Sequence, residues 1–149
     1  MHPTKGNAAR GVVHFRQTDN GVEVFAAIDG LPSGRHAYHV HVYGDCASPD
    51  AKSAGPHFHF NGSSFDTSVD IITGNLGELT GRDGGNARTA THHSRLQAAT
   101  LQGRFSLIGR SVVIHERPND HSHPPDGDAG DRVACGVIGV SSADVWRKQ

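Results

Sequence analysis

The sequence lacks any apolar run near twenty residues, the length that a membrane-spanning helix needs, so we expect no membrane span. Its first residues, MHPTKGNAARG, also lack the apolar core of a signal peptide, so we expect a chain without a leader or one whose leader was removed. An excess of one charge is missing too, because 14 Lys and Arg residues face 15 Asp and Glu residues. This balance gives no overall basic field, and we expect no nucleic-acid partner.

Cysteine is scarce, and the only two, Cys46 and Cys135, lie far apart in the sequence. This excludes a zinc ribbon, which needs closely spaced pairs of cysteines. Two arrangements remain open from composition alone. The cysteines form one long-range disulfide, or they are two buried free thiols that pack as small hydrophobic side chains.

Sustained helical periods are absent as well, and 19 glycines separate short β-branched segments, which favours a turn-rich β protein. A chain of 149 residues has room for one hydrophobic core, so residues 1–149 are predicted to form a single domain. We expect a sandwich or Greek-key barrel. Its predicted strands are a hairpin in 9–31, a strand in 35–44, a strand pair around RDGGN in 74–93, and strands in 106–116 and 133–141.

Two stretches without alternation interrupt these strands, at about 44–77 and at 118–131. Both are rich in residues that favour turns, such as Gly, Ser, Pro and Asp. A connection as long as the first is usually functional in a compact domain. We therefore expect the site in this region.

Histidine is abundant, and five histidines beside apolar strands form a pattern that suits a metal. His39 and His41 alternate along a strand, so both imidazoles project from one face. His57 and His59 repeat this spacing, and His115 ends the apolar run SVVIH. One isolated pair would fit solvent-facing polar positions equally well, but the full set favours a rigid imidazole site for copper, zinc, iron or nickel.

Two other metal chemistries compete with this interpretation. A zinc hydrolase would need a carboxylate base beside an open coordination position. A cupin-type oxygenase would use motifs that His39, His41 and Asp45 partly imitate, as do His115 and Asn119. The imitation is imperfect, because the first cupin motif normally carries Glu and the second has glycine and proline framing that is absent.

Six fragments together resemble the copper/zinc superoxide dismutase family, in that family's order: GVVHF, HVHVYGDC, SAGPHFHF, TGNLGEL, IGRSVVIHE and GDAGDRVACGVIGV. The resemblance extends from about Gly11 to Val140. It implies an all-β fold, an eight-stranded Greek-key β-barrel or immunoglobulin-like sandwich with two long functional loops. It also implies copper-dependent disproportionation of superoxide to O2 and hydrogen peroxide.

The same resemblance implies roles for particular residues. The implied copper ligands are His39, His41, His57 and His115. Arg132 is the implied guide for the superoxide anion, His57 is the imidazole that lets go of copper and takes a proton, and Cys46 with Cys135 is the implied disulfide.

Zinc is not expected, because this sequence departs from the family at the zinc ligands. Asn75 stands where the family has Asp, and the loop NGSSFDTSVDIIT lacks the two expected histidines. The sequence therefore predicts a copper-only relative of bacterial type, unless His59, Asp66 or Asp70 rebuild a zinc site.

Without zinc, another acceptor must orient the imidazole of His57. The candidates are Asp66, Asp70, Asp120 and Asp128. A copper carrier on the same barrel is the alternative function, although a carrier has no use for an anion guide. A homodimer is possible, and a disulfide would suit a periplasmic or secreted protein, with a cytoplasmic location left open.

Overall fold

The computed structural model describes residues 1–59, 72–82, 89–97 and 99–142. These residues form eight strands, one 3-10 turn and no α-helix. No helix in this part of the chain is long and apolar enough to cross a membrane. The elements are β1 (His2–Pro3), β2 (Arg10–Thr18), β3 (Gly21–Asp29), β4 (Gly34–His41), η1 (Lys52–Ala54), β5 (Asn75–Gly81), β6 (Ala90–Leu96), β7 (Ser111–His115) and β8 (Arg132–Val137).

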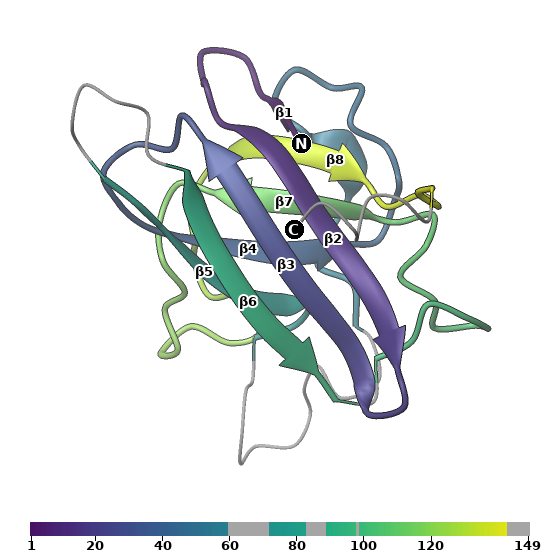
Figure 1. Ribbon diagram of the computed structural model, residues 1–149. Helices are drawn as coiled ribbons and strands as arrows, with labels where there is room; N and C mark the ends of the chain where they lie inside the picture. Colours follow the sequence, from purple (N-terminus) through teal and green to yellow (C-terminus); the bar gives the residue numbers. More distant parts are fainter. Residues whose placement is uncertain (60–71, 83–88, 98, 143–149) are drawn as a thin grey trace.

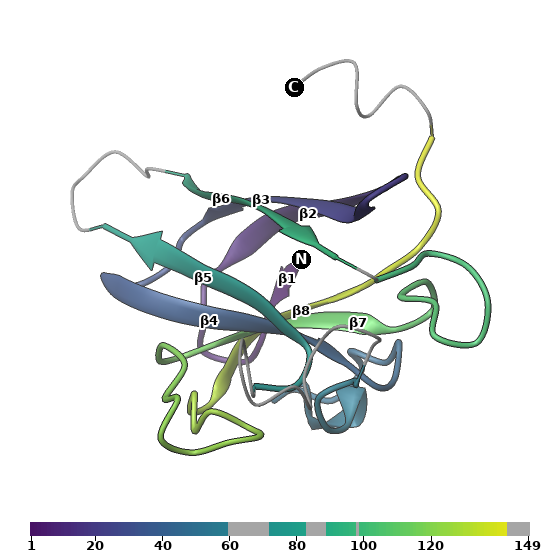
Figure 2. The same cartoon turned by 90° about the horizontal axis from the view of Figure 1, so that it is seen from below.

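The strands form two antiparallel sheets that face each other as a sandwich (Figure 1). One sheet has the order β1-β8-β7-β4-β5 and the other the order β2-β3-β6. The predicted all-β, eight-stranded sandwich is therefore confirmed. The described strands do not close into a barrel, because no hydrogen-bonded ladder joins the two sheets. Figure 2 shows the long loops gathered beneath the five-stranded sheet, away from β2, β3 and β6.

Alternation along β3 builds the core, as the sequence predicts. The inward side chains of this strand are fully buried: Val22, Val24, Ala26 and Ile28. Opposite them, β4 contributes Tyr38 and Val40 from the other sheet, also with no exposed surface. Apolar side chains from both sheets thus fill one continuous core, which is the main stabilising feature of a sandwich.

Alternation along β4 also determines where the site lies. Because successive side chains point to opposite faces, Tyr38 and Val40 enter the core while His39 and His41 project from the outer face of the sheet. Both histidines are nevertheless fully buried. The outer face of the sheet is therefore the floor of a covered polar site, on the side where Figure 2 shows the long loops.

One predicted pairing is wrong. The pattern in 74–93 indicated a strand pair around RDGGN, and both strands are present, but they belong to different sheets: β5 pairs with β4, and β6 pairs with β3. The chain therefore crosses from one sheet to the other between them. A turn signal of this kind specifies a reversal of the chain, and it does not specify whether the two arms form a ladder. Residues 83–88 lie outside the described residues.

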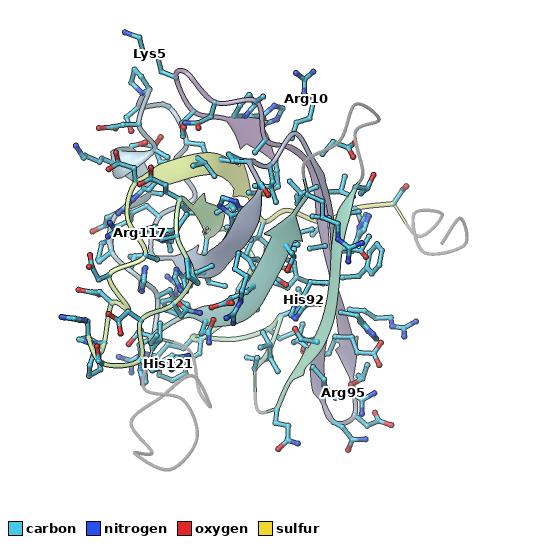
Figure 3. The ribbon with its side chains drawn as sticks, turned by 90° about the vertical axis from the view of Figure 1, so that its left-hand side faces the viewer. Lys5, Arg10, His92, Arg95, Arg117 and His121 are labelled. Carbon is cyan, nitrogen blue, oxygen red and sulfur yellow. A yellow bond between two sulfur atoms is a disulfide. The ribbon has the colours of Figure 1, made fainter. Side chains whose placement is uncertain are left out.

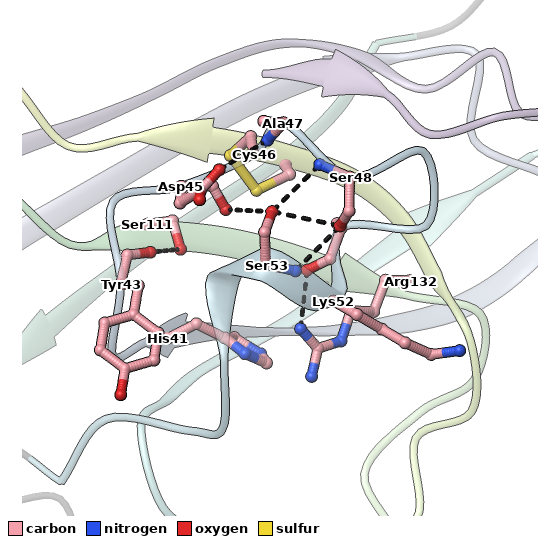
Figure 4. The surroundings of a disulfide bond; sticks show 12 residues. His41, Tyr43, Asp45, Cys46, Ala47, Ser48, Lys52, Ser53, Ser111 and Arg132 are labelled. Carbon is pink, nitrogen blue, oxygen red and sulfur yellow. Dashed lines mark hydrogen bonds between the residues drawn. A yellow bond between two sulfur atoms is a disulfide. The ribbon is translucent and has the colours of Figure 1, made fainter.

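The disulfide between Cys46 and Cys135 is present, with a sequence separation of 89 residues. It ties the loop after β4 to β8, and Ala51, Ala54 and Val113 pack around it. Beside it, the Ser48 and Ser53 hydroxyls lie 3.1 Å apart and the Ser53 amide donates to the Ser48 hydroxyl at 2.8 Å (Figure 4). This loop is therefore held in place by both a covalent bond and hydrogen bonds.

Candidate metal centre

Four imidazoles meet on the loop-covered face of the five-stranded sheet. One ring nitrogen from each can be chosen so that all four atoms lie within 4.8 Å of one another: His39, His41, His57 and His115. β4 supplies the first two, and a single bridge between His41 and His57 places the third beside them. His115 ends β7, where an irregularity in the pairing with β8 follows Ile114. The structure thus brings together the four histidines that the family resemblance implies as copper ligands.

Two backbone carbonyls determine which nitrogens of His41 and His115 face inward. His41 Nδ1–H donates to the Gly55 oxygen at 2.8 Å, and His115 Nδ1–H donates to the Gly130 oxygen at 3.3 Å. In the neutral rings, both Nε2 atoms then carry lone pairs, and they lie 3.3 Å apart. Two lone pairs at this distance repel each other. A cation between them removes the repulsion.

His39 presents its other nitrogen to the centre. Its Nε2 lies 2.7 Å from the Asn119 side-chain oxygen, and its Nδ1 is buried with no hydrogen-bond partner among the described residues. His57 also has a buried Nδ1 without a hydrogen-bond partner in this part of the chain. Buried polar atoms are normally paired. The cluster therefore has the chemistry of a site that binds a metal cation through nitrogen.

Burial keeps all four imidazoles neutral. It is the largest cause of lower pKa values, which are about 2 for His41, about 3 for His115 and about 4 for His57. The pKa of His39 also lies well below its usual value, through burial and the neighbouring imidazoles. Neutral imidazole is the form that binds metals, so the four side chains need not lose protons before binding.

A cation lies beside the cluster. The Arg132 guanidinium donates to the carbonyl oxygens of Ala51 and Gly55, each at 2.8 Å. Gly55 therefore accepts hydrogen bonds from both Arg132 and His41. Because Arg stays protonated in proteins, a fixed positive charge lies where His57, His115 and Arg132 line one open cavity of about 480 Å³.

The same cavity is lined by two carboxylates that matter for its charge, Asp126 and Asp128. Asp128 pairs with Arg117 at 3.0 Å, on the loop that Figure 3 shows on the opposite side of the molecule from Arg95. Asp126 lies 4.0 Å from His57 Nδ1, and its charge acts to raise the pKa of that ring. Asp126 could not be found from the sequence, because it lies in the turn PPDG, where an aspartate gives no sign of a role in a site.

The four expected acceptors for His57 have other surroundings. Asp120 binds Ser122 and His123, and Asp128 binds Arg117. Asp66 and Asp70 lie outside the described residues. Of the carboxylates that the structure describes, Asp126 is the one that forms a close pair with His57.

His59 does not join the cluster, although its spacing from His57 suggested a second pair on one strand. Beyond the single bridge at His57, the last two residues described before position 60 are in no strand, and the His59 side chain is exposed. Neither Asp45 nor Asn119 contributes a ligand as a cupin motif would require. Asp45 accepts from the Ala47 amide in an exposed turn, while Asn119 contacts the outward nitrogen of His39.

Comparison with known proteins agrees with this geometry. The family model described as copper/zinc superoxide dismutase matches residues 9–138. The chain belongs to the copper/zinc superoxide dismutase family. Superoxide dismutase [Cu-Zn] A of Xenopus laevis is 40% identical over 141 residues, which cover 87% of this chain and 89% of the relative.

Two further members of the family come from other kinds of organism. Superoxide dismutase [Cu-Zn] of Caulobacter vibrioides is 38% identical over 86% of this chain and 77% of its own length. Extracellular superoxide dismutase [Cu-Zn] of Brugia pahangi is 34% identical over 95% of this chain and 74% of its own length. Membership in the family favours dismutase chemistry over the cupin interpretation.

The lowered pKa values predict that the metal-free protein loses stability as the pH falls from 7.5 to 4.5. The unfolded chain binds protons at its histidines near pH 6.5, whereas the folded cluster resists protonation, so acid favours unfolding. The pKa of His57 is 6.5 in the unfolded chain and about 4 in the folded protein. This difference lowers the free energy of unfolding by about 3 kcal/mol once the pH is below both values. Urea unfolding of chelator-treated protein at both pH values measures the loss. As a control, His121→Gln replaces an exposed histidine (Figure 3) and should leave this loss of stability unchanged. An equal free energy of unfolding of the wild type at both pH values contradicts the prediction.

Proposed function

We propose that this protein is a copper-dependent superoxide dismutase that converts superoxide to O2 and hydrogen peroxide. The observation that carries this proposal is the buried four-imidazole cluster opening into the cavity that Arg132 lines. Nitrogen ligands without thiolate suit copper. Copper, when bound, supplies the one-electron exchange that zinc cannot perform.

Each side chain of the cavity has a physical task in this reaction. Arg132 attracts the superoxide anion and holds it at the open side of the cluster, because two carbonyl oxygens fix its guanidinium. His57 takes up a proton at a ring nitrogen and releases it to the departing product. The side chain of Asp126 is 80% exposed and lies 4.0 Å from His57 Nδ1. Its negative charge therefore favours the protonated form of this ring at the side of the site that meets the solvent.

We also propose that the protein works without zinc. Two described positions in the expected zinc region offer no charged donor: Ile72 is an apolar side chain with no exposed surface, and Asn75 carries a neutral amide. The metal-binding geometry among the described residues is limited to the four-imidazole cluster. These features support a copper-only site, because structural zinc sites need four donors such as His, Cys or carboxylate.

A copper carrier remains the second candidate. A carrier needs ligands and a route for metal, whereas the fixed Arg132 cation repels metal ions and attracts anions. The two carbonyl bonds that hold Arg132 therefore favour dismutation over transport.

In a superoxide-removal assay of copper-loaded protein, Arg132→Ala should lower kcat/KM by about tenfold or more, because electrostatic guidance raises association rates by about 10- to 1,000-fold. The variant should also lose most of the dependence on salt. His57→Ala should lower the rate as well. Arg95→Ala removes the same charge from the far sheet (Figure 3) and serves as the matched control. Unchanged rates in both site variants contradict the assigned roles.

Metal analysis tests the absence of zinc. Protein purified after exposure to equal copper and zinc should contain one copper per chain and no stoichiometric zinc, because Asn75 and Ile72 offer no carboxylate or imidazole. Elemental analysis by mass spectrometry measures both metals. One tightly held zinc per chain would contradict the proposal.

We propose that two copies associate through an exposed apolar surface at the end of β8. Val137 and Val140 are 56% and 86% exposed, and Ile108 lies beside them at a shallow cavity of about 280 Å³. Exposed apolar patches commonly mark interfaces. Light scattering should give the mass of two chains for wild type and of one chain for Val137→Arg. Val12→Arg, at a 46% exposed position on the other sheet, should stay dimeric; a monomeric wild type contradicts the proposal.

We propose an oxidising location, periplasmic or secreted, for this protein. The disulfide between Cys46 and Cys135 supports it, since such bonds persist outside reducing compartments. Thiol labelling of intact cells before lysis should find both cysteines blocked.

A further inference from the structure

We infer that Asn75 and Asn119 form a relay of two amides that determines which nitrogen of His39 binds the metal. Asn75 is thus the anchor of the copper ligand rather than only the residue that replaces a zinc ligand. This inference rests on the proposed copper site, although it does not depend on turnover.

The relay starts at a backbone N–H group, which can only donate a hydrogen bond. The backbone N–H of Gly77 donates to the Asn75 side-chain oxygen at 2.9 Å. A backbone N–H has no acceptor role, so the oxygen of this amide must face Gly77. Because the same oxygen faces Asn119, the side chain of Asn119 has to present its NH2 group there, and the distance is 3.1 Å.

The second amide transfers this polarity to the ligand. With its NH2 group on Asn75, Asn119 presents its oxygen to His39 Nε2 at 2.7 Å. The Nε2 atom must then carry the proton, and the lone pair lies on Nδ1. This is the buried Nδ1 atom that has no hydrogen-bond partner among the described residues and faces the cluster. One backbone amide on β5 therefore sets the tautomer of a ligand on β4 through two side chains.

Further contacts keep Asn119 in place. Its backbone N–H donates to a Glu78 carboxylate oxygen at 2.9 Å, and Glu78 forms an ion pair with Arg35. Gly127 passes so close that a Cβ atom there would lie 3.3 Å from the Asn119 oxygen and 2.7 Å from Ile72. The acceptor of His39 is thus held by both the strand and the loop.

The relay is uncharged, and this has an electronic consequence. A carboxylate that accepts from an imidazole N–H raises the basicity of the ligand, whereas a neutral amide does so much less. His39 is therefore oriented without being made strongly electron-donating. The relay favours the lower charge state of the metal more than a carboxylate in the same place would.

Copper(II) affinity tests the orienting role. Asn119→Leu and Asn75→Leu should weaken copper(II) binding by about 10- to 100-fold in competition with a chelator and should change the nitrogen couplings in the EPR spectrum. Asn75→Asp keeps an oxygen that accepts from both Gly77 and Asn119, so it should retain wild-type affinity and spectrum. Gln17→Leu removes an amide with comparable backbone contacts on the other sheet and is the control for a purely structural effect.

Copper reduction potential tests the electronic role. Asn119→Asp keeps an oxygen that accepts from His39, adds negative charge and removes the NH2 group that donates to Asn75, so its midpoint potential should be lower than that of wild type. Wild-type affinity and EPR spectra in both leucine variants overturn the relay, as does an unchanged potential in Asn119→Asp. If copper binding shifts as expected while wild type removes no superoxide, the relay stands and the proposed function fails.

Discussion

The alternation of side chains along β4 is the constraint on which the rest of the molecule depends. Tyr38 and Val40 fill the core between the sheets, so their neighbours His39 and His41 must project from the opposite face. A shift of pairing by one residue would place imidazoles in the core and apolar groups at the metal. The packing energy of the sandwich therefore also fixes the register of two ligands.

A sheet face alone would leave these imidazoles in water, and the loops turn it into a site. The loop after β4 brings His57 and the carbonyl oxygen of Gly55, and the loop after β7 brings Asn119 and the carbonyl oxygen of Gly130. Their contacts are mostly with the outward nitrogens of the rings. The strands thus place the ligands, while the loops set their tautomers and exclude solvent.

Local patterns in the sequence were sufficient for features that repeat along one strand or belong to one motif. They predicted the buried face of β3, the pair His39 and His41, and the disulfide through the family resemblance. They were wrong for the pairing of the two strands around RDGGN, because a turn signal carries no information about which sheet accepts each strand. They do not distinguish His59 from His57, because the strand pairing that would keep their alternation is a single bridge at His57.

The partners of the ligands could not be predicted, because most of them are backbone carbonyls or side chains brought by loop geometry. Asn119 was noticed four residues after His115, but in the role of a cupin ligand. Its actual contact is with His39, which lies 80 positions away in the sequence. Asp126 had no signal, since an aspartate in a PPDG turn is common for reasons of turn formation alone.

The carbonyl oxygen of Gly55 has a consequence for how this protein can vary. It accepts from His41 and from Arg132, so the atom that aims one ligand also aims the anion guide. Gly55 has a positive φ of 75°, and a side chain there would meet the Tyr43 ring at 2.6 Å. Insertions in the loop before it would misplace both groups together. Mutations in this loop that move the Gly55 carbonyl therefore change the positions of Arg132 and of His41 together. Anion guidance and ligand geometry cannot vary separately here.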